Sequence, residues 1–221
     1  MFRAAIFDMD GLLIDSERAI MDLWLRVTTS LGRPLAESEY VPVIGRAAAE
    51  SAAILTAALG QDLAERAFAE VRSILLTADP AKLFPPKRGA REVLIRLRET
   101  GVPCVAASST VSSEIRRRLA AVHLLEFFPA VVGGDQVAKG KPDPALYLLA
   151  SRSLATPPGQ CLAFEDSDNG VSAAVAAGIA VVLVPDIKTP NPSSVSHSLE
   201  VLDSLNEAIP RVETWFTRAK K

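Results

Sequence analysis

The stretch FDMDGLLIDSE, residues 7–17, follows the apolar run RAAIF at residues 3–7 and determines how the rest of the chain is interpreted. The run lacks polar alternation, which is typical of a strand covered on both faces in a parallel sheet. Asp8 and Asp10 come next, and because residues i and i+2 of an extended chain face the same side, their carboxylates point together. Gly11 then allows the chain to turn away. Two carboxylates gathered at the end of a buried strand require a cationic partner.

Four further apolar runs predict the other strands of a sheet. They are PCVAA (103–107), PAVVG (129–133), QCLAF (160–164) and IAVVLV (179–184). Between them apolar residues recur at helical spacing, as at Ile115, Leu119 and Val122. Helices alternating with buried strands predict a doubly wound α/β domain with a Rossmann-like parallel sheet. After the fifth run we expect a polar loop at 188–198 and a last helix from about 202 to 216.

Residues 16–84 interrupt this alternation, because they carry helical patterns and no strand signal. One apolar stripe consists of Ile20, Trp24, Val27 and Leu31. Glycines and prolines punctuate the segment, as expected for several helices joined by short turns. We therefore predict an all-helical cap domain at 16–84, inserted into a core domain made of residues 1–15 and 85–221.

Composition favours a small-molecule ligand. The 221 residues carry a formal net charge of −2 without long blocks of like charge, which argues against nucleic acid or an anionic membrane as partner. No run approaches the roughly 18 apolar residues of a membrane span, and the N-terminus is too acidic for a secretory signal. We expect a cytoplasmic protein, a monomer or weak dimer, with Cys104 and Cys161 as buried free thiols.

Polar residues follow the predicted strands at the points where they end. They are Asp8 and Asp10, then Ser108, Ser109 and Thr110, then Lys139 and Lys141, and finally Glu165, Asp166 and Ser167. Ligands of parallel α/β sheets gather at this edge, so these groups are expected to converge. Up to four crowded carboxylates would repel one another without a cation, and hard oxygen ligands suit Mg²⁺. Magnesium also takes phosphate oxygens as ligands, so a phosphorylated small molecule is the expected substrate.

The same groups suggest phosphoryl transfer. An aspartate beside the phosphorus could attack it and form an aspartyl-phosphate, while a second could protonate the leaving oxygen and later deprotonate a water. The order DxD, Ser, Lys in GKPDP and EDS resembles the haloacid dehalogenase-like hydrolase superfamily. FDMDGLLIDSE with a helical insertion after it resembles its β-phosphoglucomutase and sugar-phosphate phosphatase branch. The resemblance covers essentially the whole chain.

The resemblance implies a role for each matching residue. Asp8 would be the nucleophile and a magnesium ligand, and Asp10 the general acid and base, with its backbone carbonyl on the metal. The phosphate-binding residues would be Ser108, Ser109 and Lys141. Glu165 and Asp166 would complete the metal site.

Two departures from the mutases of this branch favour a phosphatase. Ile20 stands where they carry a histidine, and Ala48 where they carry an arginine, although Arg46 could replace the latter. We therefore expect a magnesium-dependent phosphatase acting on a small phosphomonoester, with Glu17 and Arg46 as candidate specificity residues. The alternatives are a phosphohexomutase of the β-phosphoglucomutase type and a phosphoacceptor signalling domain. Chain order argues against the last, because its acceptor aspartate lies in the middle of the domain.

Several of these polar residues also have a purely structural interpretation. Ser108 and Ser109, or Ser112 and Ser113, could cap the following helix, and Asp15 with Ser16 could cap the first helix of residues 16–84. Lys139 is expected to be a solvated loop lysine, since Lys141 precedes the proline. His123 and His197 have no metal-binding partner at suitable spacing and are expected to be structural or exposed.

Overall fold

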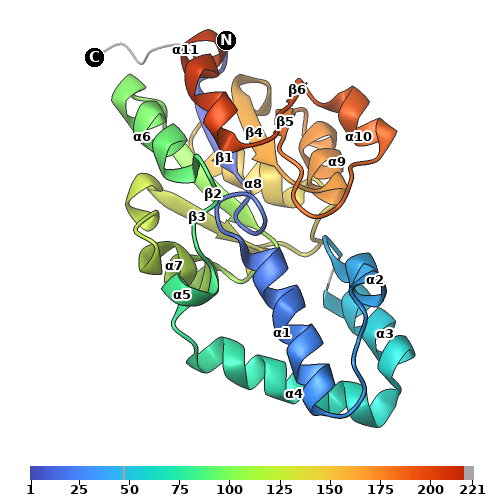
Figure 1. Ribbon diagram of the computed structural model, residues 1–221. Helices are drawn as coiled ribbons and strands as arrows, with labels where there is room; N and C mark the ends of the chain where they lie inside the picture. The colour runs from blue at the N-terminus through green and yellow to red at the C-terminus, as the bar shows by residue number, and fades with distance from the viewer. Residues whose placement is uncertain (47, 217–221) are drawn as a thin grey trace.

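A parallel sheet of six strands lies at the centre of the computed structural model, which describes residues 1–46 and 48–216 (Figure 1). The spatial order is β3-β2-β1-β4-β5-β6, and every pairing is parallel. The strands are β1 (Ala4–Phe7), β2 (Cys104–Ser108), β3 (Ala130–Gly133), β4 (Cys161–Glu165), β5 (Ala180–Leu183) and β6 (Glu200–Val201). The order reverses at β1, which lies between β2 and β4, and such a switch point is where open α/β sheets bind ligands.

Alternate residues of β1 enter two separate apolar clusters. Ala5 and Phe7 belong to one cluster, with residues of α6 (Ala90–Thr100), α7 (Ser112–Ala121) and α11 (Val212–Trp215). Ala4 and Ile6 belong to the other, with residues of α8 (Ala145–Ser153) and α9 (Asp168–Ala176). Both faces of the sheet are therefore covered by helices, and the predicted doubly wound α/β fold is confirmed.

The five predicted strands are correct to within one residue at each end. The sixth, β6, was missed because two residues carry no readable alternation. Short one-turn 3-10 helices occur at Leu125–Phe127, Gly134–Gln136 and Pro158–Gln160.

Two predictions for the C-terminal part are wrong. The segment 188–198 is not a continuous loop, because it contains α10 (Pro192–His197), where Asn191 accepts a hydrogen bond from the Ser194 amide and proline occupies the first position. The last helix is also not a single α-helix. It is a 3-10 helix, Leu205–Arg211, followed by α11. Pro210 has no backbone N–H, so a continuous α-helix would lack one of its backbone hydrogen bonds here.

The described residues between 16 and 84 form helices and no strand. These elements are α1 (Ser16–Ser30), α2 (Glu37–Tyr40), a 3-10 helix (Val41–Val43), α3 (Ala48–Leu59), α4 (Gln61–Thr77) and α5 (Pro80–Leu83). Figure 1 shows α1, α3 and α4 together, away from the sheet, and they share an apolar cluster of their own that includes Trp24, Leu55 and Val71. The domain boundaries proposed at residues 15/16 and 84/85 stay a prediction. None of the described helices combines the length and apolar character needed to cross a membrane.

Candidate active site

The strand order brings the predicted site residues to one edge of the sheet. Phe7 of β1 pairs with Ala106 of β2 and Phe164 of β4, so the residues that follow these strands are neighbours. A cavity of about 490 Å³ opens there. Its lining includes Asp8, Asp10, Glu17, Arg46, Ser108, Ser109, Lys141 and Asp166. Glu165 is fully buried beneath the lining.

Lys141 binds two buried carboxylates at the floor of the cavity. Its Nζ lies 2.5 Å from Asp8 Oδ1 and also donates to Glu165 Oε1. Burial alone would lower the pKa of Lys141, but the charges of Asp8 and Glu165 raise it above its usual range, so the ammonium group stays protonated. Burial raises the pKa of Asp8, as do Glu165 and Asp10, and Lys141 opposes them.

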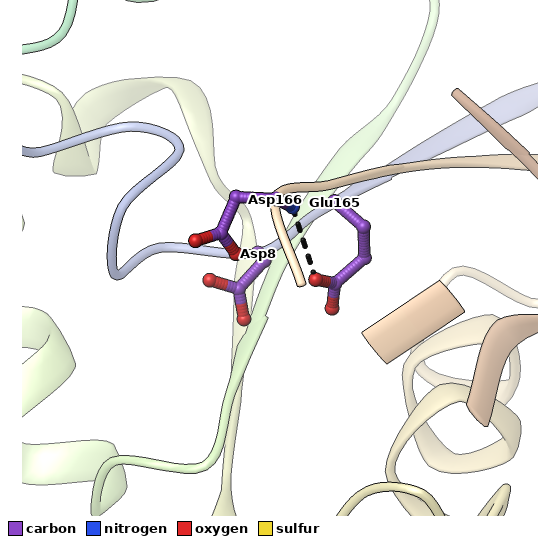
Figure 2. A group of neighbouring side chains, drawn as sticks. All are labelled: Asp8, Glu165 and Asp166. Carbon is purple, nitrogen blue, oxygen red and sulfur yellow. Dashed lines mark hydrogen bonds between the residues drawn. The ribbon is translucent and has the colours of Figure 1, made fainter. Parts of the chain in front are cut away.

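Carboxylate oxygens of Asp8, Glu165 and Asp166, one from each residue, lie within 4.8 Å of one another. Figure 2 shows the three side chains gathered close together. Burial, followed by repulsion from Asp8 and Glu165, raises the pKa of Asp166, which is the behaviour of carboxylates crowded without enough positive charge. In the described part of the chain no donor contacts the Asp166 carboxylate. This donor set fits a hard divalent cation, so the acidic cluster could bind a metal.

Glu165 is already engaged on both carboxylate oxygens. Oε1 accepts from Lys141 and, at 2.5 Å, from the Tyr147 hydroxyl, while Oε2 accepts from the Ser167 hydroxyl at 3.1 Å. Its contact with Lys141 holds that lysine against Asp8. Asp8 and Asp166 are therefore the members of the cluster with carboxylate oxygens left open toward the cavity.

Gly11 makes the tight turn that the sequence predicts. Its φ is +79°, and its amide donates to the Ile14 carbonyl at 3.0 Å. A Cβ at this position would lie 2.2 Å from Asp166 Oδ2. The turn therefore requires glycine at this position for two reasons: the backbone has a positive φ, and a side chain would collide with the acidic cluster.

Asp10 accepts hydrogen bonds from four side chains. Ser16 Oγ (2.7 Å) and Arg118 Nη1 (2.9 Å) donate to Oδ1, and Ser108 Oγ (2.9 Å) and Thr110 Oγ1 (2.8 Å) donate to Oδ2. Sequence reasoning missed Arg118. The available signal was its place on α7, because it lies three residues after Ile115 and four before Val122, on the stripe that was interpreted as buried. A buried arginine needs an anionic partner.

The capping interpretations are wrong. The helix α7 begins after Val111 with no side-chain cap, and the Ser112 amide and hydroxyl both donate to Asp135 instead. The side chain of Asp15 likewise makes no capping bond to α1. The Ser16 hydroxyl instead donates to Asp10 Oδ1, where the negative charge of the carboxylate strengthens the hydrogen bond.

Two candidate specificity residues, Glu17 and Arg46, face the cavity from the helical segment. Glu17 has no hydrogen bond or ion pair among the described residues, and burial, together with repulsion from Asp10 and Asp186, raises its pKa to about 7. Arg46 is exposed and bonds the Pro42 carbonyl and Glu50.

The loop that carries Arg46 contacts the core through its main chain. Asn169 Nδ2 donates to the Gly45 carbonyl at 2.7 Å, and Lys188 Nζ donates to the Ile44 carbonyl at 3.4 Å. Ile20 lines the same cavity and packs against both neighbouring apolar clusters.

Other predicted residues play no part in the cavity. Lys139, His123 and His197 are exposed, as expected. Both cysteines are free and buried, which confirms that expectation too.

Comparison with known proteins identifies the family. The family model for haloacid dehalogenase-like hydrolases matches residues 2–178. A phosphorylated carbohydrates phosphatase of Thermotoga maritima is 35% identical over 181 residues, which covers 80% of this chain and 82% of that protein. A β-phosphoglucomutase of Bacillus subtilis is 29% identical over 191 residues, which covers 81% and 82% of the two chains.

A solved structure supports the same assignment. A HAD family hydrolase from Deinococcus radiodurans, with bound phosphate and sodium, has a TM-score of 0.78 and 26% identity over 99% of each chain. The chain belongs to the haloacid dehalogenase-like hydrolase family. The predicted family and the prediction of a hydrolytic enzyme are confirmed, so the alternative of a signalling domain is not supported.

Proposed function

We propose that this protein is a magnesium-dependent phosphatase that hydrolyses a small phosphomonoester, most suitably a sugar phosphate, through an aspartyl-phosphate on Asp8. The observation that carries the proposal is the placement of Asp8 between a protonated lysine and an acidic cluster at the floor of a cavity. The name of the Thermotoga relative supports the substrate class, and the phosphate in the Deinococcus structure supports the ligand chemistry.

The first step would transfer the phosphoryl group to Asp8. The open carboxylate oxygen of Asp8 attacks phosphorus as the bond to the ester oxygen breaks, and Asp10 delivers a proton to that departing oxygen. In the second step Asp10 takes a proton from water, whose oxygen attacks phosphorus. Inorganic phosphate then leaves and the Asp8 carboxylate is restored.

Electrostatic stabilisation would provide much of the rate enhancement. Lys141 supplies a fixed positive charge beside Asp8, and Ser108 with the Ser109 amide would contact the phosphoryl oxygens. Asp8, the Asp10 carbonyl and Asp166 would hold the magnesium ion directly. Glu165, whose oxygens already accept from Lys141, Tyr147 and Ser167, would complete the site by holding Lys141 against Asp8. When bound, the ion offsets the negative charge of these carboxylates and of the substrate phosphate.

The second candidate function is a phosphohexomutase, and the similarity to a β-phosphoglucomutase favours keeping it. Against it stands the apolar Ile20 in the cavity wall, which can neither exchange a proton with Asp10 nor bind phosphate. Water is therefore the proposed phosphoryl acceptor.

Residues 16–84 would act as a cap domain over the core formed by 1–15 and 85–221. Their side chains would select the substrate, with Glu17 and Arg46 as the proposed contacts. We further propose that the protein is cytoplasmic and that it is a monomer or a weak dimer. Its partner would be a phosphorylated metabolite.

A phosphate-release screen against phosphorylated metabolites tests the proposal, with the wild type in Mg²⁺, the wild type in EDTA, and Asp8→Asn in Mg²⁺. We expect phosphate release only from the wild type in Mg²⁺, and the highest rate with one or a few sugar phosphates. Equal release from Asp8→Asn and wild type would refute the mechanism. Conversion of glucose 1-phosphate to glucose 6-phosphate, primed by a trace of the bisphosphate and without phosphate release, would instead establish the mutase.

A further inference from the structure

Arg118 is a buried charged residue that the proposed mechanism does not yet use. Its side chain is 9% exposed and contacts three different groups. Nη1 donates to Asp10 Oδ1 at 2.9 Å, and Nε donates to Glu114 Oε1 at 2.7 Å. The guanidinium carbon lies 4.4 Å from the centre of the Phe84 ring. Contacts on two edges and one face leave the group little freedom to move.

The neighbouring arginines on α7 behave differently. Arg116 is exposed and has no partner among the described residues. Arg117 is partly exposed and bonds Glu114 and the Leu75 carbonyl. Only Arg118 reaches the cavity. Removing a guanidinium from water is costly, so its burial here is explained by its carboxylate partners.

The donors around Asp10 fall into two kinds. Ser16, Ser108 and Thr110 have hydroxyls that rotate freely and can accept as well as donate. Arg118 offers a planar, permanently charged donor whose direction is fixed by Glu114 and Phe84. The orientation of the Asp10 carboxylate therefore depends mainly on Arg118.

The two oxygens of Asp10 are held unequally as a result. Oδ1 accepts from Arg118 as well as from the Ser16 hydroxyl, whereas both donors of Oδ2 are hydroxyls of the cavity lining. A substrate oxygen can replace a hydroxyl at small cost because the hydroxyl can rotate to another acceptor.

We propose that Arg118 is a positioning residue, which anchors Oδ1 of Asp10 so that Oδ2 is presented to the leaving oxygen of the substrate. This inference rests on the proposed phosphatase function. If Arg118 acts in this way, its replacement should lower activity only in reactions that need Asp10.

The leaving group of the substrate provides the test. An alkoxide needs a proton as it departs, whereas nitrophenolate leaves without one, and kcat/KM reports the steps through departure. For Arg118→Met we expect kcat/KM to fall at least about 30-fold with the best sugar phosphate, part of the 10²–10⁴-fold typical of general acid catalysis. With p-nitrophenyl phosphate the fall should be under about 3-fold. Equal falls with both substrates would overturn the proposal.

A double-mutant cycle tests whether Arg118 acts through Asp10. Adding Arg118→Met to Asp10→Asn should cause no further loss with the sugar phosphate, because the group being positioned is already absent. A fully additive loss would contradict the inference. Arg116→Met, on the same helix, is the matched control and should leave both substrates unaffected.

Folding is controlled separately. Thermal unfolding of each variant identifies any that is destabilised, and Arg118→Lys should recover part of the sugar-phosphate activity. If Arg118→Met does not fold, Glu114→Gln loosens the arginine without removing it, and we expect a smaller fall confined to the sugar phosphate. A uniform fall there would count against the proposal. A wild type that releases no phosphate would instead refute the proposed function itself.

Discussion

The cavity has two walls of opposite character. On the core side, the side chains of Asp8, Lys141 and Glu165 are at most 7% exposed, and each one bonds another. On the helical side, Arg46 is 45% exposed and its carboxylate partner Glu50 is 59% exposed. The core side of the cavity is therefore built from buried, interlocked charges, whereas the side chains of Arg46 and Glu50 are exposed and free to adjust. If substrate binds here, its specificity contacts are expected on the adjustable side.

The largest effect is expected when the core wall loses its cation. Lys141→Met leaves Asp8 and Glu165 buried without their shared partner, and breaking a buried ion pair costs about 3–5 kcal/mol. Phosphate release should fall at least about 10³-fold, because a preorganised charge beside the reacting group is lost. Urea unfolding and steady-state kinetics measure both. Lys139 is an exposed lysine two residues away, and Lys139→Met should match the wild type. A similar loss in that variant would show that the effect does not depend on the buried ion pairs of Lys141.

A smaller effect is expected from crowding the same wall without changing any charge. In Gly170→Ala the new Cβ would lie 1.9 Å from the Glu165 carboxyl carbon, so Glu165 must move and loosen its hold on Lys141. We expect a loss of about 3 kcal/mol of stability, as for overpacked interiors. Thermal unfolding and a crystal structure of the variant measure the loss and the shift. Gly159→Ala, where nothing lies within 4 Å of the new Cβ, is the control, and equal stability of the two variants would refute the prediction.

Residues placed in the site by strand topology could be predicted from the sequence, whereas residues placed there by tertiary contacts could not. Asp8, Asp10 and Asp166 follow buried strands, and strand ends converge by topology alone, so order along the chain was sufficient. Arg118 acts through a tertiary contact with Asp10, and α7 gives no local sign of that partner. The helix α10 was missed for a different reason, since its serines and proline are typical of loops until Asn191 caps it.

A third prediction concerns Glu17, where the two walls meet. The unfolded chain ionises this group near pH 4.5, whereas the folded protein keeps the proton until about pH 7, so its burial lowers stability as pH rises through that window. Glu17→Gln should therefore stabilise the metal-free protein at pH 8 by on the order of 2 kcal/mol and leave it nearly unchanged at pH 4. Denaturant unfolding in EDTA at both pH values measures this. Glu37→Gln, at an exposed glutamate, should show no pH-dependent gain, and the same absence at Glu17 would contradict its burial.

The smallest effect is expected on the helical side of the cavity. Arg46→Ala removes an exposed ion pair with Glu50, and such pairs contribute about 0.5 kcal/mol or less to stability. If Arg46 contacts substrate, KM for the best sugar phosphate should rise several-fold while kcat changes little, because a binding contact away from the phosphorus is lost. Arg72→Ala, at an exposed arginine on α4, should change neither constant. An unchanged KM in Arg46→Ala would remove that residue from the specificity set.

The two contacts that join residues 44 and 45 to the core have a consequence for how this enzyme can diversify. Asn169 and Lys188 grip carbonyl oxygens, which every amino acid carries. The docking of this loop therefore survives replacement of the side chains around it. Mutation can change the side chain at Arg46, which lines the cavity, while the two contacts that hold the loop against the core are kept.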